Sequence, residues 1–285
     1  MTQRVLILGA SGKVGRHSAR AFAAAGWDVR RFDRARDDLM QAARGCDVIV
    51  HGMNPPDYHD WQGIMPAITR AVIEAARAAG ACVILPGNVY HYGDQGGVWS
   101  QDTPPNPVSR KGAIRLRMER DLAASGVQTI VLRAGNFIDP EGRDCVMARL
   151  YLRALGRGRI TLPGPIDTRQ AMCFLPDWAR AAVALAERRH SLARFEDVPF
   201  PGHTLSARDI RDGLECLMQR RLSVAPFPWW LFTLTAPVWE LAREMREMRY
   251  LWHTDHALCG ARLAALLPGF AVTPLDRVLR QMLPA

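Results

Sequence analysis

Three glycines with a spacing of three residues could bind phosphate. Gly9, Gly12 and Gly15 follow an apolar, branched run at residues 5–8, and a helix-like segment, 17–25, comes after them. A glycine turn lets phosphate groups approach the backbone, and the amino terminus of a helix offers free N–H groups and partial positive charge. This order of strand, turn and helix predicts a dinucleotide site. The residues expected to bind its phosphates are Gly9, Ser11, Gly12, Lys13, Val14 and Gly15.

A carboxylate after the next predicted strand bears on which dinucleotide binds. Residues 27–32 read as a strand, and Asp33 follows it. A carboxylate here can accept hydrogen bonds from both adenine-ribose hydroxyls and repels a 2′-phosphate, which favours NAD. Arg34 comes next, and its guanidinium could bind that phosphate instead. We therefore predict NAD at Asp33 and Arg34, and NADP stays open as the alternative.

Polar residues also follow the third and fourth predicted strands. Residues 47–51 run into Gly52, Met53 and Asn54, which we expect to contact the cofactor, because strand ends on this side of a parallel sheet line the ligand crevice. Residues 82–85 run into Asn88 and Tyr90. These two lie two positions apart on a segment expected to be extended, so their side chains should face the same way.

The elements that must position these residues alternate between strand and helix throughout the first half. Helices are predicted at 38–45, 61–79 and 109–124, and 93–107 has the composition of an irregular loop. The alternation predicts an α/β fold with a doubly wound parallel sheet and helices on both faces. After Arg133 the pattern changes to a smaller, mostly helical portion. Its predicted helices are 147–155, one opening at 174–178, 206–218, 238–252 and 275–283.

These segments together resemble the extended short-chain dehydrogenase/reductase superfamily, in particular its NAD-dependent epimerase/dehydratase group. The likeness is carried by the glycine fingerprint, Asp33, Val89-Tyr90-His91-Tyr92-Gly93, Arg133-Ala134-Gly135-Asn136-Phe137 and Leu175-Pro176-Asp177-Trp178. The resemblance implies a Rossmann-type domain that binds NAD(P), formed by 1–133 and about 170–198. It also implies a C-terminal substrate cap formed by about 134–169 and 199–285.

The chain departs from that family at the catalytic motif. The family has a Tyr-x-x-x-Lys pair on a helix, in which the tyrosine acts as acid/base and the lysine holds the nicotinamide ribose. Counting back from Glu119, which suits the family's downstream glutamate, places Lys111 at the tyrosine position and Arg115 at the lysine position. Asn88 stands where the family has a serine that helps to polarise the substrate.

Lys111 and Arg115 are four residues apart, so they share one helix face. Burial and a neighbouring like charge could depress the pKa of a lysine and let it act as acid or base near neutrality, while Arg115 binds ribose hydroxyls or phosphate. The alternative is that both lie on a solvated helix face. Tyr90 is a second candidate for the missing phenol, and its alternative is a core or rim aromatic.

Two functions follow from these residues. The first is an NAD(P)-dependent oxidoreductase or epimerase/dehydratase that acts on a small molecule through Lys111, Asn88 and Tyr90, with Arg115 at the nicotinamide ribose. The second is a non-catalytic dinucleotide-binding protein that senses redox state or binds a partner, which the absence of the usual tyrosine favours.

Composition narrows the classes of partner and compartment. The 285 residues carry a net charge of +9, but the basic residues are scattered, so we expect no nucleic-acid partner. The six cysteines contain no Cys-x-x-Cys pair, so we expect no metal site, and free thiols indicate a reducing cytoplasm. We expect no signal peptide, because the first strand begins almost at once. The uncharged stretch 224–239 is short and contains prolines, so we interpret it as a pocket or interface rather than a membrane contact. The expected partner is a small-molecule substrate, and a homodimer is an open alternative.

Overall fold

The computed structural model describes residues 2–142 and 144–283, and a six-stranded parallel sheet lies at its centre. The strand order is β10-β6-β4-β3-β1-β2. The strands are β1 (Arg4–Leu8), β2 (Asp28–Arg31), β3 (Val48–His51), β4 (Cys82–Gly87), β6 (Thr129–Arg133) and β10 (Phe195–Pro199). From β1 the chain first adds β2 on one side and then β3 on the other, so the order reverses between β1 and β3. A ligand crevice is expected at the carboxyl ends of those two strands.

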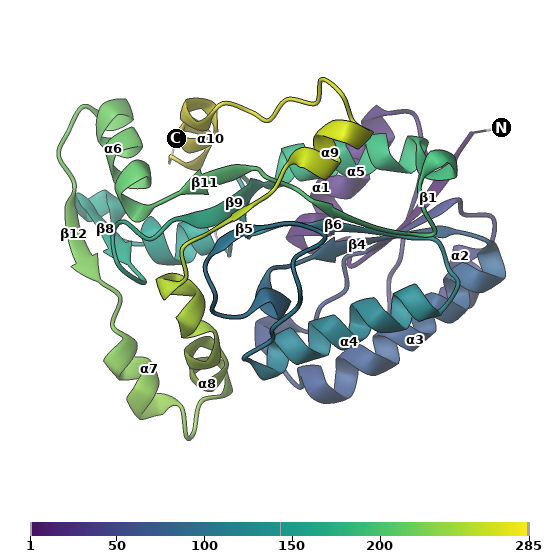
Figure 1. The fold of residues 1–285 in the computed structure, drawn as a ribbon, viewed down its shortest axis with the longest axis horizontal. Helices are drawn as coiled ribbons and strands as arrows, with labels where there is room; N and C mark the ends of the chain where they lie inside the picture. The colour runs from purple at the N-terminus through teal and green to yellow at the C-terminus, as the bar shows by residue number, and fades with distance from the viewer. Residues whose placement is uncertain (1, 143, 284–285) are drawn as a thin grey trace.

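Helices cover both faces of this sheet, as the alternation predicted (Figure 1). One face carries α1 (Lys13–Ala24) and α5 (Leu175–Glu187), and the other carries α2 (Leu39–Ala43), α3 (Trp61–Ala79) and α4 (Arg110–Ala124). Apolar side chains alternate along the strands between the two layers. The doubly wound α/β fold is therefore confirmed.

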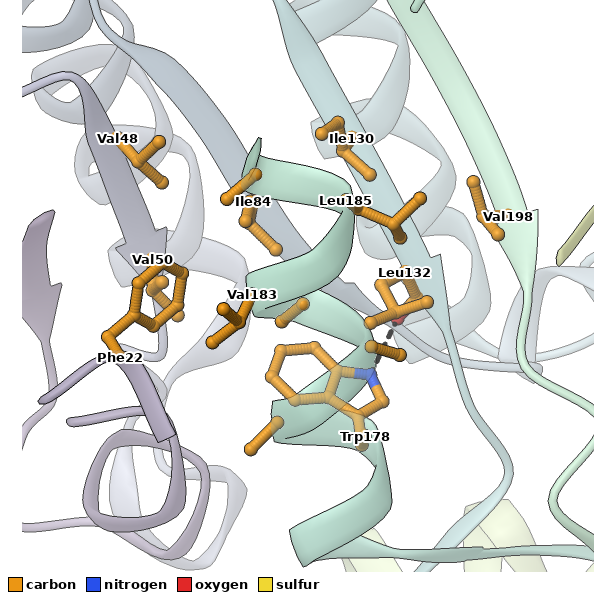
Figure 2. Packing of buried hydrophobic residues seen from close by; sticks show 14 of the residues in the cluster. Phe22, Val48, Val50, Ile84, Ile130, Leu132, Trp178, Val183, Leu185 and Val198 are labelled. Carbon is orange, nitrogen blue, oxygen red and sulfur yellow. Dashed lines mark hydrogen bonds between the residues drawn. The ribbon is translucent and has the colours of Figure 1, made fainter. Parts of the chain in front are cut away.

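Trp178 of α5 forms the centre of one core layer (Figure 2). Its side chain is fully buried against the sheet and packs with Phe22, Ile84 and Leu132 in one cluster. The indole N–H donates a hydrogen bond of 3.1 Å to the Leu132 carbonyl, so its one polar atom is satisfied. This contact fixes α5 across the strands that lead into the crevice.

The helices that border the crevice begin at residues whose side chains cap them. The Ser109 hydroxyl accepts a hydrogen bond of 3.0 Å from the Gly112 N–H at the start of α4. Asp60 caps α3 in the same way through the Gly63 N–H, and Gly80 ends that helix in the left-handed conformation. These caps explain why α3 and α4 begin where the sequence predicted.

The cap, by which we mean 134–174 and 200–283 as far as described, contains short strands among its helices. It includes 170–174, which the predicted division assigned to the Rossmann domain, because this strand pairs with two others of the cap. The strands β7 (Asn136–Ile138), β9 (Gln170–Phe174) and β11 (His203–Leu205) form one sheet, and β8 (Arg159–Leu162) pairs with β12 (Ser223–Pro226). The helices are α6 (Ala207–Met218), α7 (Trp229–Thr235), α8 (Glu240–Glu247), α9 (Ala261–Leu266) and α10 (Leu275–Met282).

Some local predictions were wrong. The expected loop 93–107 contains a strand, β5 (Gly97–Trp99), which pairs with β13 (His256–Leu258) from the far end of the chain. The expected helix 238–252 divides into α8 and a 3-10 segment, Met248–His253. The expected helix 147–155 is a π turn, Met147–Tyr151, followed by a 3-10 turn, Leu155–Arg157. Tertiary pairing and packing decided these segments, and local patterns do not report either.

The apolar stretch 224–239 forms β12 and α7. Trp229 is buried, whereas Trp230 is 66% exposed and Val238 is 91% exposed. No helix among the described residues has the length and apolar character needed to cross a membrane.

Candidate functional site

The glycine loop between β1 and α1 is tightly folded. Gly9 has a φ of +71°, and a Cβ added there would lie 2.6 Å from the Gly52 carbonyl oxygen. A Cβ on Gly15 would collide with the Gly9 carbonyl. The Gly12 N–H donates a hydrogen bond of 2.9 Å to that same carbonyl, which closes the turn. Only glycine fits at Gly9 and Gly15, so the loop keeps its backbone close to the crevice.

The amino terminus of α1 faces the end of this turn without a side-chain cap. Gly12 is the capping residue, and the first turn of the helix contains no acidic residue. Ser11 and Gly12 are exposed, and Val14 is half-buried. Free N–H groups and the helix dipole at this position suit the phosphates of a dinucleotide. The loop therefore fits the pyrophosphate that the glycine spacing predicted.

Lys13 lies on α1 but reaches toward the cap. Its amine donates a hydrogen bond of 3.1 Å to the Asp144 carbonyl. Further along α1, the buried His17 contacts Asp139 at 2.9 Å, and Arg20 forms an ion pair with Glu141. These contacts join α1 to the segment after β7. Local sequence patterns do not indicate them, because the partners are more than a hundred residues apart.

Asp33 and Arg34 are exposed just beyond the end of β2, next to β1 in the sheet. The Asp33 carboxylate accepts a hydrogen bond of 3.0 Å from the Ala35 N–H, and the Asp33 N–H donates to Asp37 at 2.8 Å. This turn holds the Asp33 carboxylate at the carboxyl edge of the sheet. Its position is that expected of a group that binds the adenine ribose.

The end of β3 adjoins the glycine loop. The Gly52 N–H donates a hydrogen bond of 3.0 Å to the Leu8 carbonyl, and a Cβ on Gly52 would lie 2.7 Å from that oxygen. Met53 is half-buried beside this contact, and Asn54 is exposed with its amide donating to the Pro55 carbonyl at 3.2 Å. The structure thus brings Gly52 and Met53 to the loop that contains Gly9.

Asn88 and Tyr90 follow β4, but not on an extended segment. A 3-10 turn, Tyr90–Tyr92, begins at once, so the prediction that the two side chains face the same way from an extended strand was wrong in its premise. The Asn88 side-chain oxygen accepts a hydrogen bond of 3.1 Å from the Tyr90 N–H. The Tyr90 hydroxyl lies 3.3 Å from the hydroxyl of Tyr58, which belongs to a 3-10 turn, Pro56–Tyr58, beyond the end of β3.

Lys111 is 1% exposed, and its amine contacts carboxylates of the cap. It forms ion pairs with Glu244 and, at 2.8 Å, with Glu247, both on α8. Burial opposes ionisation of Glu247, yet the hydrogen bond and the charge of Lys111 outweigh it and lower the pKa of that carboxyl. The expectation of a solvated helix face is wrong for Lys111. The groups that touch its amine are acids, not the like charge of Arg115 that the sequence suggested.

Arg115 lies one turn further along α4 and has no carboxylate partner among the ion pairs of the described residues. Its guanidinium lies 5.4 Å from the Trp61 ring centroid, and its Nε is buried without a hydrogen-bond partner. Burial lowers the pKa of Arg115. A cation with an unsatisfied donor at a crevice is suited to an anionic or hydroxyl-bearing ligand.

His51 ends β3 beneath this arginine. Both of its ring nitrogens are buried without a partner. Burial, together with the charge of Arg115, lowers the pKa of His51 to about 3. His51 is therefore neutral at physiological pH, and no sequence pattern indicates that its ring lacks partners.

Glu119, from which the position of Lys111 was counted, binds a buried arginine. The Arg133 guanidinium donates to Glu119 at 2.8 Å, to Asp197 at 2.6 Å and to the Asn88 carbonyl at 2.7 Å. This cluster joins α4, β6 and β10 to the turn after β4. Arg133 thereby positions Asn88 and the segment that carries Tyr90.

All six cysteines are free thiols. Within 2–142 and 144–283, no group of three or more His, Cys, Asp or Glu side chains is arranged to hold a metal ion. His256, which lies close in sequence to His253, has its Nδ1 atom 2.9 Å from the Thr254 carbonyl.

Comparison with known structures reveals the same fold over almost the whole chain. MoeE5 in complex with UDP-glucose and NAD has a TM-score of 0.77 at 18% sequence identity, covering 98% of this chain and 97% of that one. UDP-glucuronic acid 4-epimerase from Bacillus cereus in complex with NAD has a TM-score of 0.77 at 17% identity, with 98% and 97% covered. TunA, described as an NAD-dependent NDP-hexosamine 5,6-dehydratase, has a TM-score of 0.75 at 18% identity, with 99% and 96% covered.

No curated protein matches the chain. The model of the NAD dependent epimerase/dehydratase family matches residues 5–198, which include the glycine loop, α4 and the whole six-stranded sheet except the first residue of β1 and the last of β10. The chain therefore belongs to the NAD-dependent epimerase/dehydratase family.

Proposed function

We propose that this protein binds NAD and uses it in the epimerisation, dehydration or oxidoreduction of a small molecule at a carbinol or carbonyl carbon. The observation that carries the proposal is the tight turn that only glycine permits at Gly9 and Gly15, which leads into a helix start without a side-chain cap. Bound NAD supplies a reversible hydride acceptor. In this proposal the loop binds the pyrophosphate and Asp33 binds the adenine ribose. NADP is tested as well, because Arg34 lies next to Asp33 and could bind a 2′-phosphate.

The remaining site residues act on the nicotinamide half and on the substrate. Arg115 binds ribose hydroxyls through its guanidinium, whose Nε has no partner, and Gly52, Met53 and Asn54 line the cofactor crevice. Asn88 orients the turn that carries Tyr90, and the Tyr90 phenol exchanges a proton with the substrate. The ion pairs of Lys111 with α8 favour a charged, anchoring lysine over the acid/base that its position suggested.

A nucleotide sugar is the substrate class that we propose. UDP-glucose is bound to MoeE5, and TunA is described as acting on an NDP-hexosamine. The net charge of +9 suits a substrate that carries a diphosphate. The likeness to these structures shows the fold. Calorimetric titration with UDP-sugars tests the substrate class.

Calorimetric titration with NAD and NADP tests the cofactor, and the same titration of the NAD-loaded protein with UDP-glucose and UDP-glucuronic acid tests the substrate class. We expect NAD to bind more tightly than NADP and a UDP-sugar to bind the loaded protein. Gly156→Ala serves as a control substitution that should leave NAD binding unchanged, because a Cβ at Gly156 meets no atom within 4 Å. Absence of NAD binding by a folded sample would refute the proposal.

A non-catalytic dinucleotide sensor is the second candidate. The observation that favours it is Lys111, which stands at the family's tyrosine position and is fully engaged by Glu244 and Glu247. A sensor should bind NAD and leave supplied nucleotide sugars chemically unchanged, with no reduction of the bound NAD. A new sugar product, or NADH absorbance on addition of a sugar, would identify an enzyme.

We also propose the domain division 1–133 with 170–198 against 134–169 with 199–285, a cytoplasmic location, and a homodimer. The free thiols, four of them buried, support a reducing compartment. Exposed apolar residues on and near α7, such as Trp230 and Leu234, support self-association. Light scattering after gel filtration would measure the assembly.

A further inference from the structure

We propose that Tyr58 and Tyr90 form a two-phenol acid/base site, in which Tyr90 exchanges the substrate proton and Tyr58 stabilises the resulting phenolate. This proposal rests on the proposed function, since it supplies the proton transfer that accompanies hydride transfer to NAD. Tyr58 lies on a different segment from any catalytic position considered above, so the pair acts from outside α4.

The two hydroxyls meet because their turns follow neighbouring strands. β3 and β4 pair in parallel, so their carboxyl ends lie at one edge of the sheet. Beyond these ends Tyr58 closes one short turn and Tyr90 begins another. The hydroxyl oxygens are 3.3 Å apart. Tyr58 has a φ of +64° and its neighbour Asp57 a φ of +49°, which are costly for residues other than glycine. Surrounding contacts must hold that turn, and they place the Tyr58 ring against α4.

Cations from α4 face the pair. The Lys111 amine lies 5.1 Å from the Tyr58 ring centroid, at the position that the family pattern gives to tyrosine. The charge of Arg115 acts on both phenols. The other ionisable groups around them are Arg149 on the π turn, Tyr250, whose hydroxyl donates to the Tyr90 carbonyl at 3.3 Å, and Glu244 and Glu247, which neutralise Lys111. Arg115 is thus the cation without a carboxylate partner here, and it favours a phenolate.

The two phenols have different roles. A negative charge on Tyr90 is the main influence that raises the pKa of Tyr58, and burial and the shared hydrogen bond add to it. Tyr58 therefore keeps its proton and donates a hydrogen bond to the Tyr90 oxygen when Tyr90 ionises. This is how a second phenol stabilises the first, through a charge-assisted hydrogen bond.

The pair supports oxidation of a carbinol and the reverse reduction of a carbonyl. In the oxidative direction the carbinol O–H bond breaks and its proton goes to the Tyr90 phenolate oxygen. The C–H bond breaks with its electron pair, which reduces the bound NAD, and the carbinol carbon becomes a carbonyl. In the reductive direction Tyr90 returns the proton to the carbonyl oxygen. Tyr58 moves no net proton, so it is a positioning residue.

Ultraviolet titration of tyrosinate in the protein without ligand tests the pair directly. Burial raises the pKa of Tyr92, Tyr151 and Tyr250, so few phenols compete at lower pH. We expect the tyrosinate transition at the lowest pH to be absent from Tyr90→Phe. In Tyr58→Phe this transition should move to higher pH. Tyr151→Phe is the matched control, since it removes a buried hydroxyl whose pKa is raised by burial alone.

Turnover on a UDP-sugar that binds is the second measurement. Tyr90→Phe should lower kcat about 10²- to 10⁴-fold, as for loss of a general acid/base. Tyr58→Phe should lower kcat roughly tenfold and shift the pH–rate profile to higher pH, while NAD affinity stays within about twofold. A purely structural role for Tyr58 would not move that profile.

Failure of the Tyr58–Tyr90 pair and failure of the proposed function give different results in these measurements. An unchanged first tyrosinate transition in Tyr58→Phe overturns the pair even where NAD binds and turnover is observed. A shifted transition without NAD binding by the wild-type protein overturns the proposed function, and with it the catalytic use of the pair. A shift in the pH–rate profile that matches the shift in the phenol titration supports both.

Discussion

The Lys111 amine lies 2.8 Å from one carboxylate oxygen of Glu247, and the Lys111 N–H donates to the other oxygen at 3.2 Å. One residue of α4 thus binds one residue of α8 through both its side chain and its backbone. Glu244 and Arg110 extend the contact, with Arg110 donating to Glu244 at 3.1 Å. This buried ion cluster is the main polar link between α4 and the cap.

Removing the buried charge should destabilise the protein strongly. Lys111→Met leaves Glu244 and Glu247 beside an apolar side chain, and loss of one partner from a buried pair costs about 3–5 kcal/mol. We expect the free energy of unfolding, measured by urea denaturation, to fall by that amount. Arg110→Ala is the control, because its side chain is 61% exposed and such pairs contribute about 1 kcal/mol or less. Equal losses for the two variants would contradict the role given to Lys111.

The glycine loop should not tolerate a methyl group at Gly15. A Cβ there collides with the Gly9 carbonyl and with the Ala10 backbone, whereas a Cβ on Gly12 lies 3.2 Å from that carbonyl. We expect Gly15→Ala to weaken NAD binding more than 100-fold, or to unfold the loop, on the scale of about 3 kcal/mol for overpacking. Gly12→Ala should have a smaller effect. Calorimetry gives the affinities, and circular dichroism separates lost binding from lost fold.

Asp33 should determine the preference between the two dinucleotides. Removing its carboxylate in Asp33→Ser deletes hydrogen bonds to the ribose and the repulsion of a 2′-phosphate, while Arg34 remains. We expect the ratio of NADP to NAD dissociation constants to fall about tenfold or more, since one charged hydrogen bond is worth about 1.5–3 kcal/mol. Asp28→Asn, at the opposite end of β2, should leave the ratio unchanged. An unchanged ratio in Asp33→Ser would exclude Asp33 from the ribose site.

Buried histidine should make the protein less stable in mild acid. Burial and Arg115 lower the pKa of His51 from 6.5 to about 3, so the folded state stays neutral where the unfolded state binds a proton. The contribution of His51 is complete above about pH 6.5 and is lost as the pH falls toward 3, by about 1.4 kcal/mol per pH unit. Burial, with Arg133, likewise lowers the pKa of His91 to about 4.

Urea denaturation at pH 7 and pH 5 checks this dependence. His51→Leu should reduce the change in unfolding free energy between pH 7 and pH 5 by the contribution of one histidine. The contribution of His91 should remain. His190→Gln changes an exposed ring and should not alter the slope. A slope that His51→Leu leaves intact would show that His51 is protonated in the folded protein.

The cofactor loop could be predicted from sequence because its determinants are local. Gly9, Gly12 and Gly15 act within one turn and the helix that follows it, and Asp33 ends the next strand. Family membership rests on the same segments. The alternation of apolar runs with helical periods was enough to predict the doubly wound sheet.

The part of the site that we propose for catalysis could not be predicted in this way, because its contacts are long-range. Lys111 and Glu247 are 136 residues apart, and a helix pattern around Lys111 carries no trace of α8. Tyr58 and Tyr90 meet only because β3 and β4 are neighbours and both chains turn at their ends. Counting along α4 therefore identified a position and left its chemistry open.

The cap has a further consequence for how this chain can come apart. It is built from two separate segments of the chain, one that includes β7, β8 and β9 and one that begins with β11. Strands of the two segments pair with each other, β11 with β9 and β12 with β8. A single proteolytic cut between α5 and β11 should therefore leave two fragments that stay associated through edge-to-edge strand pairing. Co-expression of the two fragments should reconstitute the fold, much as a split reporter does.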